Sequence, residues 1–117
     1  LLRRWTGNFD ALTEGSLADY HDAFRKPEVI HATCNDYRAG ASIDRQHDQA
    51  SRDAGEKIQC PVHVIWGRGY LSTRAGSPLP VWQQWSDNVA ETGLDCGHFV
   101  AEELPDDCAR AMLQFFQ

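Results

Sequence analysis

Residues 58–67 of this 117-residue chain read IQCPVHVIWG. Apolar side chains are nearly continuous in this run, and its second half is rich in β-branched residues. A strand of a parallel sheet that is covered on both faces has this composition, because neither of its faces meets water. The run therefore predicts a buried strand in a parallel sheet.

The residues after this run predict a second strand and a closing helix. A loop rich in Gly, Ser and Pro is expected over 68–80, a short helix over 81–85, and a weaker strand over 88–95 that Gly93 interrupts. Pro105 can open the last helix, and acidic residues follow it in the first turn. The predicted inner face of this helix carries Cys108, Ala109, Met112, Leu113 and Phe116. The order is a βαβα unit, in which a right-handed crossover joins two parallel strands.

The residues before this unit predict helices only. Residues 1–15 look like a loop, and Ser16 is the expected N-cap of a helix that stops at Pro27. A second helix runs from Pro27 to a break at 39–41, and a charged, exposed helix over 42–54 ends at Gly55. We therefore expect an α/β chain in two parts, a helical segment over 1–56 and the βαβα part over 57–117.

Composition excludes several classes of protein. The formal net charge of −6 and the lack of a basic stripe argue against a nucleic-acid partner. No apolar run approaches the roughly 20 residues that a membrane-spanning helix needs. The four cysteines form no C-x-x-C pair, and Cys60 and Cys96 are predicted to be small buried residues. Without a secretory signal we expect reduced thiols and a cytoplasmic protein. The first residue is not Met, so the chain is expected to begin inside a longer one or to be processed.

The strongest candidate for chemistry is His98, in the run CGHFVAEELP over 96–105. This histidine stands in a turn between a predicted strand and a predicted helix, where backbone on both sides can hold it. A general base needs such a fixed position, within hydrogen-bond reach of a water or hydroxyl. The alternative is a histidine whose ring only bonds the backbone of its loop, and the turn by itself does not separate the two.

Asp95 and Tyr37 are two further candidates. Asp95 is central in a G-x-D-x-G pattern over 93–97, but a nucleophile elbow takes its base from elsewhere in the chain, and here the histidine is only three residues on. Tyr37 could donate a hydrogen bond to an anion with help from Arg38. A helix tyrosine packed on the core, with its hydroxyl at the rim, is the favoured alternative when the sequence is considered alone.

Other residues give weak signals. Gly67-Arg68-Gly69 follows a strand but lacks the third glycine of a dinucleotide-binding loop. Ser72 and Ser77 lie in a loop with no base beside them. The residues with metal-ligand chemistry match no common zinc spacing, so no metal is expected; they are His31, Cys34, His47 and His63.

Taken together, several motifs resemble the C-terminal part of haloacetate (fluoroacetate) dehalogenases, which are α/β-hydrolases with a helical cap. The resemblance begins near Ile30 and runs to the end of the chain. Its motifs are IHATCNDYRAG over 30–40, DRQHD over 44–48, CPV over 60–62, WG over 66–67, VW over 81–82, and CGHF over 96–99 followed by AEE over 101–103.

The resemblance implies a role for two residues. In that family a carboxylate displaces the halide and forms an ester, which a histidine-activated water then hydrolyses; the matching histidine is His98. A cap tyrosine that contacts the leaving halide matches Tyr37, and positioned donors of this kind stabilise developing charge. The family's nucleophile, triad acid and substrate arginines have no counterpart in this chain, and the loop after Gly67 has no aspartate before Pro80. The resemblance therefore implies a haloacid site that this chain completes with another segment, no cofactor, and no activity of the chain alone.

Two alternatives stay open at this point. One is a non-catalytic protein built from a hydrolase half that works by self-association. The other is an epoxide-hydrolase-like or esterase-like enzyme whose site another chain completes. For each we expect a homo-oligomer or association with the missing half, because a two-stranded sheet is marginal alone and its edges invite pairing. The sequence specifies neither the preferred halide nor the oligomer size.

Overall fold

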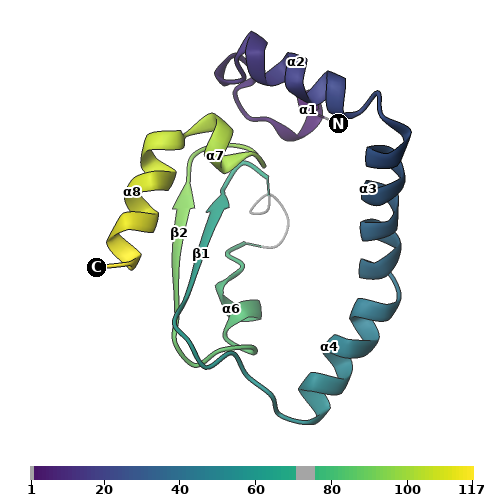
Figure 1. Cartoon of the computed structure of the whole chain (residues 1–117). Helices are drawn as coiled ribbons and strands as arrows, with labels where there is room; N and C mark the ends of the chain where they lie inside the picture. The colour runs from purple at the N-terminus through teal and green to yellow at the C-terminus, as the bar shows by residue number, and fades with distance from the viewer. Residues whose placement is uncertain (1, 71–75) are drawn as a thin grey trace. The chain divides into compact units, whose positions relative to one another are not determined.

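The computed structural model describes residues 2–70 and 76–117, and its sheet contains two parallel strands. Strand β1 (Val62–Gly67) pairs with β2 (Val89–Leu94), from Val62 opposite Val89 to Gly67 opposite Leu94. The predicted parallel pair is therefore confirmed (Figure 1). The first strand begins later than its apolar run, because the N–H of Ile58 donates to the carbonyl of Trp85, outside the ladder, at 2.8 Å.

Within residues 57–70 and 76–117, three helices accompany the strands. Helix α6 (Leu79–Trp82) lies between them in the chain, and α7 (Val100–Glu103) and α8 (Pro105–Phe115) follow β2. Helix α8 contacts both strands, and α6 contacts β2, on the other side of the pair (Figure 1). The observed order is thus the predicted βαβα unit, with α7 added before the last helix.

The inner face of α8 differs from the predicted one. Ala111 is buried, Cys108 and Phe115 are half-buried, and the Phe115 ring stacks on His63 of β1 at 5.2 Å. Of the five predicted members only Cys108 is covered, and the other four are exposed: Ala109, Met112, Leu113 and Phe116. Both stripes have helical spacing, so periodicity alone could not decide which one meets the sheet.

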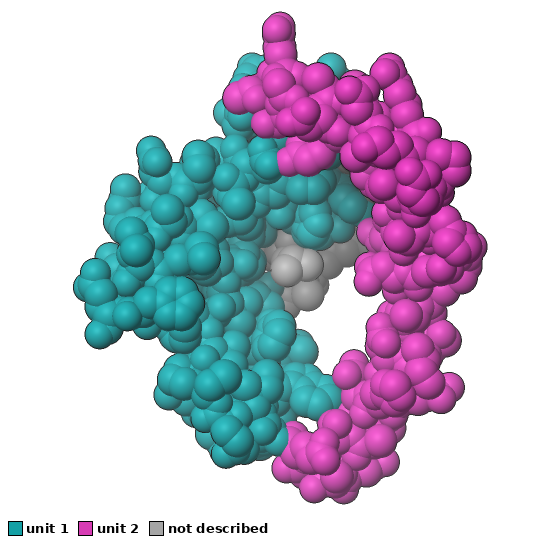
Figure 2. Space-filling view, viewed as in Figure 1, with its two compact units in different colours: residues 1–12, 57–117 teal, residues 13–56 magenta. Residues whose placement is uncertain are grey.

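The first residues form short helices where a loop was predicted. Helix α1 (Leu2–Trp5) is followed by the 3-10 helix η1 (Phe9–Ala11), whose N-cap Asn8 accepts a hydrogen bond from the N–H of Asp10 at 3.2 Å. Each element is too short for sequence periodicity to reveal. This segment, up to Leu12, clusters with residues 57–117 in one compact unit (Figure 2).

Residues 13–56 form the second compact unit, which is helical throughout. It contains α2 (Glu14–Ala23), α3 (Pro27–Gly40) and α4 (Ile43–Asp53), and α3 contacts α4. The N-cap of α2 is Thr13 rather than Ser16, since the Thr13 hydroxyl accepts from the N–H of Ser16 at 3.1 Å. No residue of this fully described stretch is buried.

Among the residues that the structure describes, buried side chains are few and belong to the strand-containing unit. The apolar ones are Leu12, Trp66, Cys96 and Ala111, and the polar ones are Ser86 and Glu103. The prediction of a buried Cys60 is wrong: this residue precedes β1 and its side chain is exposed, whereas Cys96 is buried as predicted.

Candidate active site

The loops that follow β1 and β2 meet at the C-terminal end of the sheet, because parallel strands end on the same side. The N–H of Arg68 donates to the carbonyl of Leu94 at 2.8 Å, and the N–H of Gly69 donates to the carbonyl of Cys96 at 2.9 Å. Gly67 lies so close to the second loop that an added Cβ would stand 1.7 Å from the Gly97 oxygen. The two loops therefore pack backbone against backbone, which gives this end of the sheet a fixed shape.

His98 is placed in the second of these loops. Its backbone N–H donates to the carbonyl of Trp5 at 2.7 Å, and its side chain is exposed. The imidazole contacts three aromatic rings, with centroid distances of 4.4 Å to Tyr70, 5.3 Å to Trp5 and 5.0 Å to Phe99. Across residues 2–70 and 76–117, neither ring nitrogen has a hydrogen-bond partner. Aromatic contacts thus orient the ring, while its nitrogens stay available to a water or a substrate.

Glu103, at the end of α7, is the buried carboxylate of this site. It is 7 % exposed, and its oxygens accept hydrogen bonds from backbone N–H groups. The donors are Gly7 at 2.8 Å, Asn8 at 3.0 Å, Gly97 at 2.9 Å and Phe99 at 3.2 Å. Burial by itself raises the pKa of the Glu103 carboxyl, but these four donors together outweigh burial and hold the pKa below its usual range. Glu103 is therefore an anion in the folded protein.

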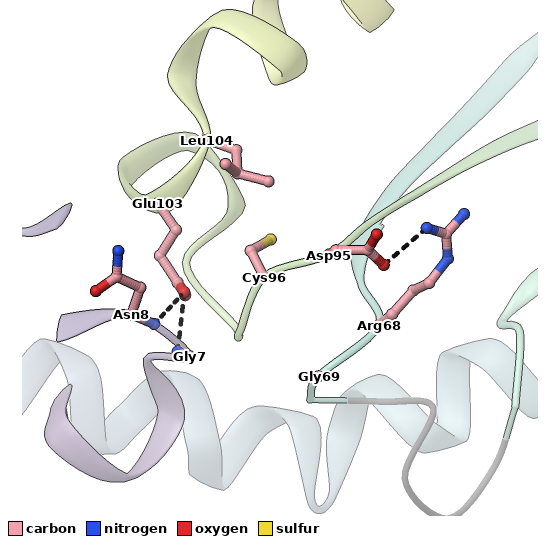
Figure 3. A pocket seen from close by; sticks show the side chains of 8 residues that line it. All are labelled: Gly7, Asn8, Arg68, Gly69, Asp95, Cys96, Glu103 and Leu104. Atoms are coloured by element: carbon pink, nitrogen blue, oxygen red, sulfur yellow. Dashed lines mark hydrogen bonds and ion pairs between the residues drawn. The ribbon is translucent and has the colours of Figure 1, made fainter. Parts of the chain in front are cut away.

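A cleft beside this loop is lined by residues from four segments of the strand-containing unit, of which only α7 is a regular element (Figure 3). They are Gly7, Asn8, Arg68, Gly69, Asp95, Cys96, Glu103 and Leu104. Arg68 and Asp95 pair across its rim at 2.9 Å, and both side chains are largely exposed. Burial raises the pKa of the Cys96 thiol, and the nearby carboxylates of Glu103 and Asp95 raise it further. Cys96 is consequently a protonated, weakly nucleophilic thiol at neutral pH.

Tyr37 lies on α3, which belongs to the helical unit of residues 13–56. Its side chain is 64 % exposed, so the alternative of a tyrosine packed on the core does not hold within its unit. Arg38, the predicted helper, donates to the side-chain oxygen of Asn35 at 2.6 Å, and the Asn35 amide meets the His31 ring at 3.0 Å. His98 and Tyr37 thus belong to separate units, and their meeting in one site stays a prediction.

Two of the weaker candidates, His63 and Ser77, form hydrogen bonds that hold neighbouring elements together. The His63 ring meets the Thr92 hydroxyl at 2.9 Å across the two strands, and the Ser77 hydroxyl donates to Glu91. Ser72 lies outside the described residues. In the part of the chain with a described structure, no group of three or more His, Cys, Asp or Glu side chains could hold a metal ion. Within that part, none of the helices combines the length and the apolar character required to cross a membrane.

Comparison with known proteins adds the family. The chain is 35 % identical over 106 residues to a fluoroacetate dehalogenase of Burkholderia sp, covering 91 % of this chain and 34 % of that protein. It is 30 % identical over 122 residues to a soluble epoxide hydrolase of Corynebacterium sp. strain C12, covering 98 % and 40 %. A solved structure from Nostoc sp PCC 7120, described as an α/β hydrolase, matches with a TM-score of 0.91 at 40 % identity over 99 % of this chain and 39 % of that one.

The chain belongs to the α/β-hydrolases. Among the solved α/β-hydrolases is a protein of Pseudomonas aeruginosa, described as an epoxide hydrolase and solved as a mutant with bound MFA. It matches with a TM-score of 0.86 at 39 % identity, over 97 % of this chain and 38 % of that one. No family model matches the chain. The α/β-hydrolase chain described here spans about a third of the length of the curated relatives it matches, at 34 % and 40 % of their lengths.

Sequence reasoning found His98 in this α/β-hydrolase but missed Glu103. The glutamate stands beside Glu102 and before a proline-started helix, where acidic residues are ordinary because they favour a helix N-terminus. The available signal was the pair Gly7 and Gly97, since glycine permits close approach of two backbones. That signal becomes specific only when both glycines are seen to flank one carboxylate.

Proposed function

We propose that this chain supplies His98 as the general base of a hydrolytic haloacid dehalogenase. The observation that carries the proposal is the exposed imidazole, oriented by aromatic rings where two parallel strands end. Ligands of α/β sheets bind outside the carboxyl ends of the strands, which is where this ring lies. The 35 % identity to a fluoroacetate dehalogenase favours a haloacetate as the substrate.

The proposed reaction has two steps. A carboxylate from a segment outside this chain attacks the halogen-bearing carbon, so that a carbon–oxygen bond forms, the carbon–halogen bond breaks and the halide leaves. His98 then takes a proton from water as that water attacks the ester carbonyl. The ester carbon–oxygen bond then breaks, the protonated histidine gives its proton to the departing alkoxide to form the hydroxy acid, and the released carboxyl group loses its proton to solvent and is a carboxylate again. Tyr37 is proposed to donate its phenol proton in a hydrogen bond to the departing halide.

The test is a chimera in which this chain replaces the matching third of the Burkholderia fluoroacetate dehalogenase. We expect sustained fluoride release from fluoroacetate, and none from this chain alone. His98→Gln in the chimera should lower turnover by roughly 10²–10⁴-fold, because the water loses its base. It should still release up to one fluoride per protein, and the ester should appear in the mass of the protein.

The control is His47→Gln, which makes the same change on an exposed position of α4 and should leave turnover unchanged. Sustained fluoride turnover by His98→Gln would reject His98 as the base. Opening of epoxides without any fluoride release would favour the epoxide-hydrolase alternative, which the Corynebacterium relative supports. A folded chimera inactive on both substrates would favour a non-catalytic role, and activity of the chain alone would mean that it contains its own nucleophile.

A further inference from the structure

Three consecutive backbone N–H groups around His98 are tied to other segments. The N–H of Gly97 donates to Glu103 at 2.9 Å, that of His98 to the Trp5 carbonyl at 2.7 Å, and that of Phe99 to Glu103 at 3.2 Å. A loop with all three donors fixed has little freedom to rotate, since each turn of the backbone would break a bond. The position of the His98 Cα is therefore set by Glu103 and Trp5.

The same carboxylate holds the N-terminal segment of the unit. Glu103 accepts from the N–H groups of Gly7 at 2.8 Å and Asn8 at 3.0 Å, although these residues are 96 and 95 positions away in the chain. Figure 3 shows the Glu103 side chain reaching from α7 to this segment. The segment in turn carries Trp5, whose ring contacts the His98 ring at 5.3 Å. One side chain thus fixes the backbone on both sides of His98 and the segment that carries one of the three rings packed against it.

No space is left between these segments for a different arrangement. A Cβ added to Gly97 would lie 2.2 Å from the Gly7 nitrogen and 2.5 Å from the Trp5 oxygen, and a Cβ added to Gly7 would lie 2.7 Å from the Gly97 nitrogen. Contacts this short would be to backbone atoms, which cannot move aside alone. The two glycines permit the approach, and the carboxylate between them satisfies the N–H groups that this approach buries.

The charge of Glu103 is stabilised by backbone alone. Among the described residues, no Lys, Arg or His forms an ion pair with it. A buried carboxylate is costly unless its oxygens are hydrogen-bonded, and hydrogen bonds to a charged acceptor are stronger than neutral ones. The donors are backbone groups of two segments, residues 7–8 and 97–99, so these hydrogen bonds hold the two segments together.

We propose that Glu103 is a positioning residue for His98, which it holds against Trp5 by binding both loop backbones. The role rests on the proposed function of His98 as a base, because only then does the ring's exact place matter for chemistry. The prediction about geometry is nevertheless tested without turnover. A chain that lacks dehalogenase activity can therefore still confirm or reject it.

The experiment follows the His98 ring by NMR in the whole chain, comparing Glu103→Gln with Asp106→Asn. Asp106 lies exposed at the start of α8, so its variant removes one carboxylate without touching the loop. In the wild type and in Asp106→Asn, ring currents of Trp5 and Tyr70 should shift the His98 ring protons from free-histidine values. In Glu103→Gln that shift should fall by at least half. Hydrogen exchange of the Gly7, Asn8, Gly97 and Phe99 amides should rise roughly tenfold to a hundredfold.

A His98 ring signal that coincides in the wild type and in a folded Glu103→Gln would overturn the proposal, whatever the amides do. If Glu103→Gln does not fold, native-state exchange of the wild type decides. The four amides should then exchange with protection factors within tenfold of one another, because one carboxylate holds them all. Protection of Gly97 and Phe99 with free exchange of Gly7 and Asn8 would reject the link between the segments.

Discussion

Gly97 lies where a larger side chain has no room. A methyl group at this position would meet backbone atoms of Gly7 and Trp5 at 2.2 and 2.5 Å, so that two loops would have to separate. We expect Gly97→Ala to lower the free energy of unfolding by about 1–3 kcal/mol, the usual cost of overpacking, measured by urea denaturation. Gly40→Ala is the control, since no atom lies within 4 Å of its added Cβ and alanine is the better helix former. Equal stability of the two variants would contradict the observed backbone packing.

Glu103 makes stability depend on acid pH. Its pKa is lowered in the folded protein, so the ionised carboxylate contributes stability that is fully present above the unfolded value of about 4.3. That contribution is lost as the pH falls from this value through the folded pKa. We expect the stability difference between wild type and Glu103→Gln, measured by urea unfolding, to be largest near pH 7 and to shrink below pH ~4.3. A difference that is constant between pH 7 and pH 3 would contradict the proposed hydrogen bonding.

At the scale of elements, one carboxylate on β2 connects the strand pair to α6. Glu91 accepts from the indole N–H of Trp66 on β1 at 3.0 Å and from the Ser77 hydroxyl, which itself accepts from the N–H of Leu79 at 3.0 Å. Glu91→Ala should lower the free energy of unfolding by about 1–3 kcal/mol, because the buried indole loses its acceptor. Glu91→Gln retains an acceptor oxygen and should lose less. Thermal unfolding followed by tryptophan fluorescence measures both, and equal losses would mean that the indole bond contributes nothing.

Some of the helices and strands could be predicted from the sequence, and others could not. Strand β1 was predictable because its apolar, β-branched run has few alternatives, and α3 because Pro27 marks its first turn. Strand β2 was the weaker prediction, since Gly93 interrupts it. The inner face of α8 was not predictable, since Ala111 and Phe115 compete with an equally apolar stripe at Met112 and Phe116. Packing against the sheet decides which of the two stripes is buried, and the local sequence of α8 does not contain this information.

The candidate site likewise contains one residue that the sequence singled out and one that it did not. His98 became a candidate because a histidine in a turn after a strand can serve as a general base, and the resemblance, rather than the turn, favoured that role; the role itself stays a prediction. Glu103 was not predictable, because its role comes from Gly7 and Asn8, more than ninety residues away in the chain. The N-cap of α2 shows the local version of this problem, since Thr13 and Ser16 are both good caps and only the backbone distinguishes them.

At the scale of the whole molecule, the strand-containing unit exposes surface that hydrolase sheets normally cover. Its sheet has two strands, so in the described structure each strand has one unpaired edge. Helix α8 and its C-cap residue also expose large apolar side chains, with Leu113 at 65 % and the C-cap Phe116 at 76 %. A pair of strands is marginal by itself, and apolar stripes at helical spacing usually meet a partner. We therefore expect the chain to associate, with copies of itself or with the remaining segment of a hydrolase.

Self-association can be measured by light scattering and sedimentation of the purified chain at micromolar concentrations. We expect a mass above that of one chain, and we expect Leu113→Asp to lower it, because a buried charge would be costly where the apolar stripe of α8 meets its partner. Gln114→Asp is the matched control: it adds the same charge to the next, exposed position of α8 and should leave the mass unchanged. If Leu113→Asp has no effect while the wild type associates, the strand edges are the contact instead. A monomer that unfolds in one sharp transition would show that these two strands and their helices are stable without any partner.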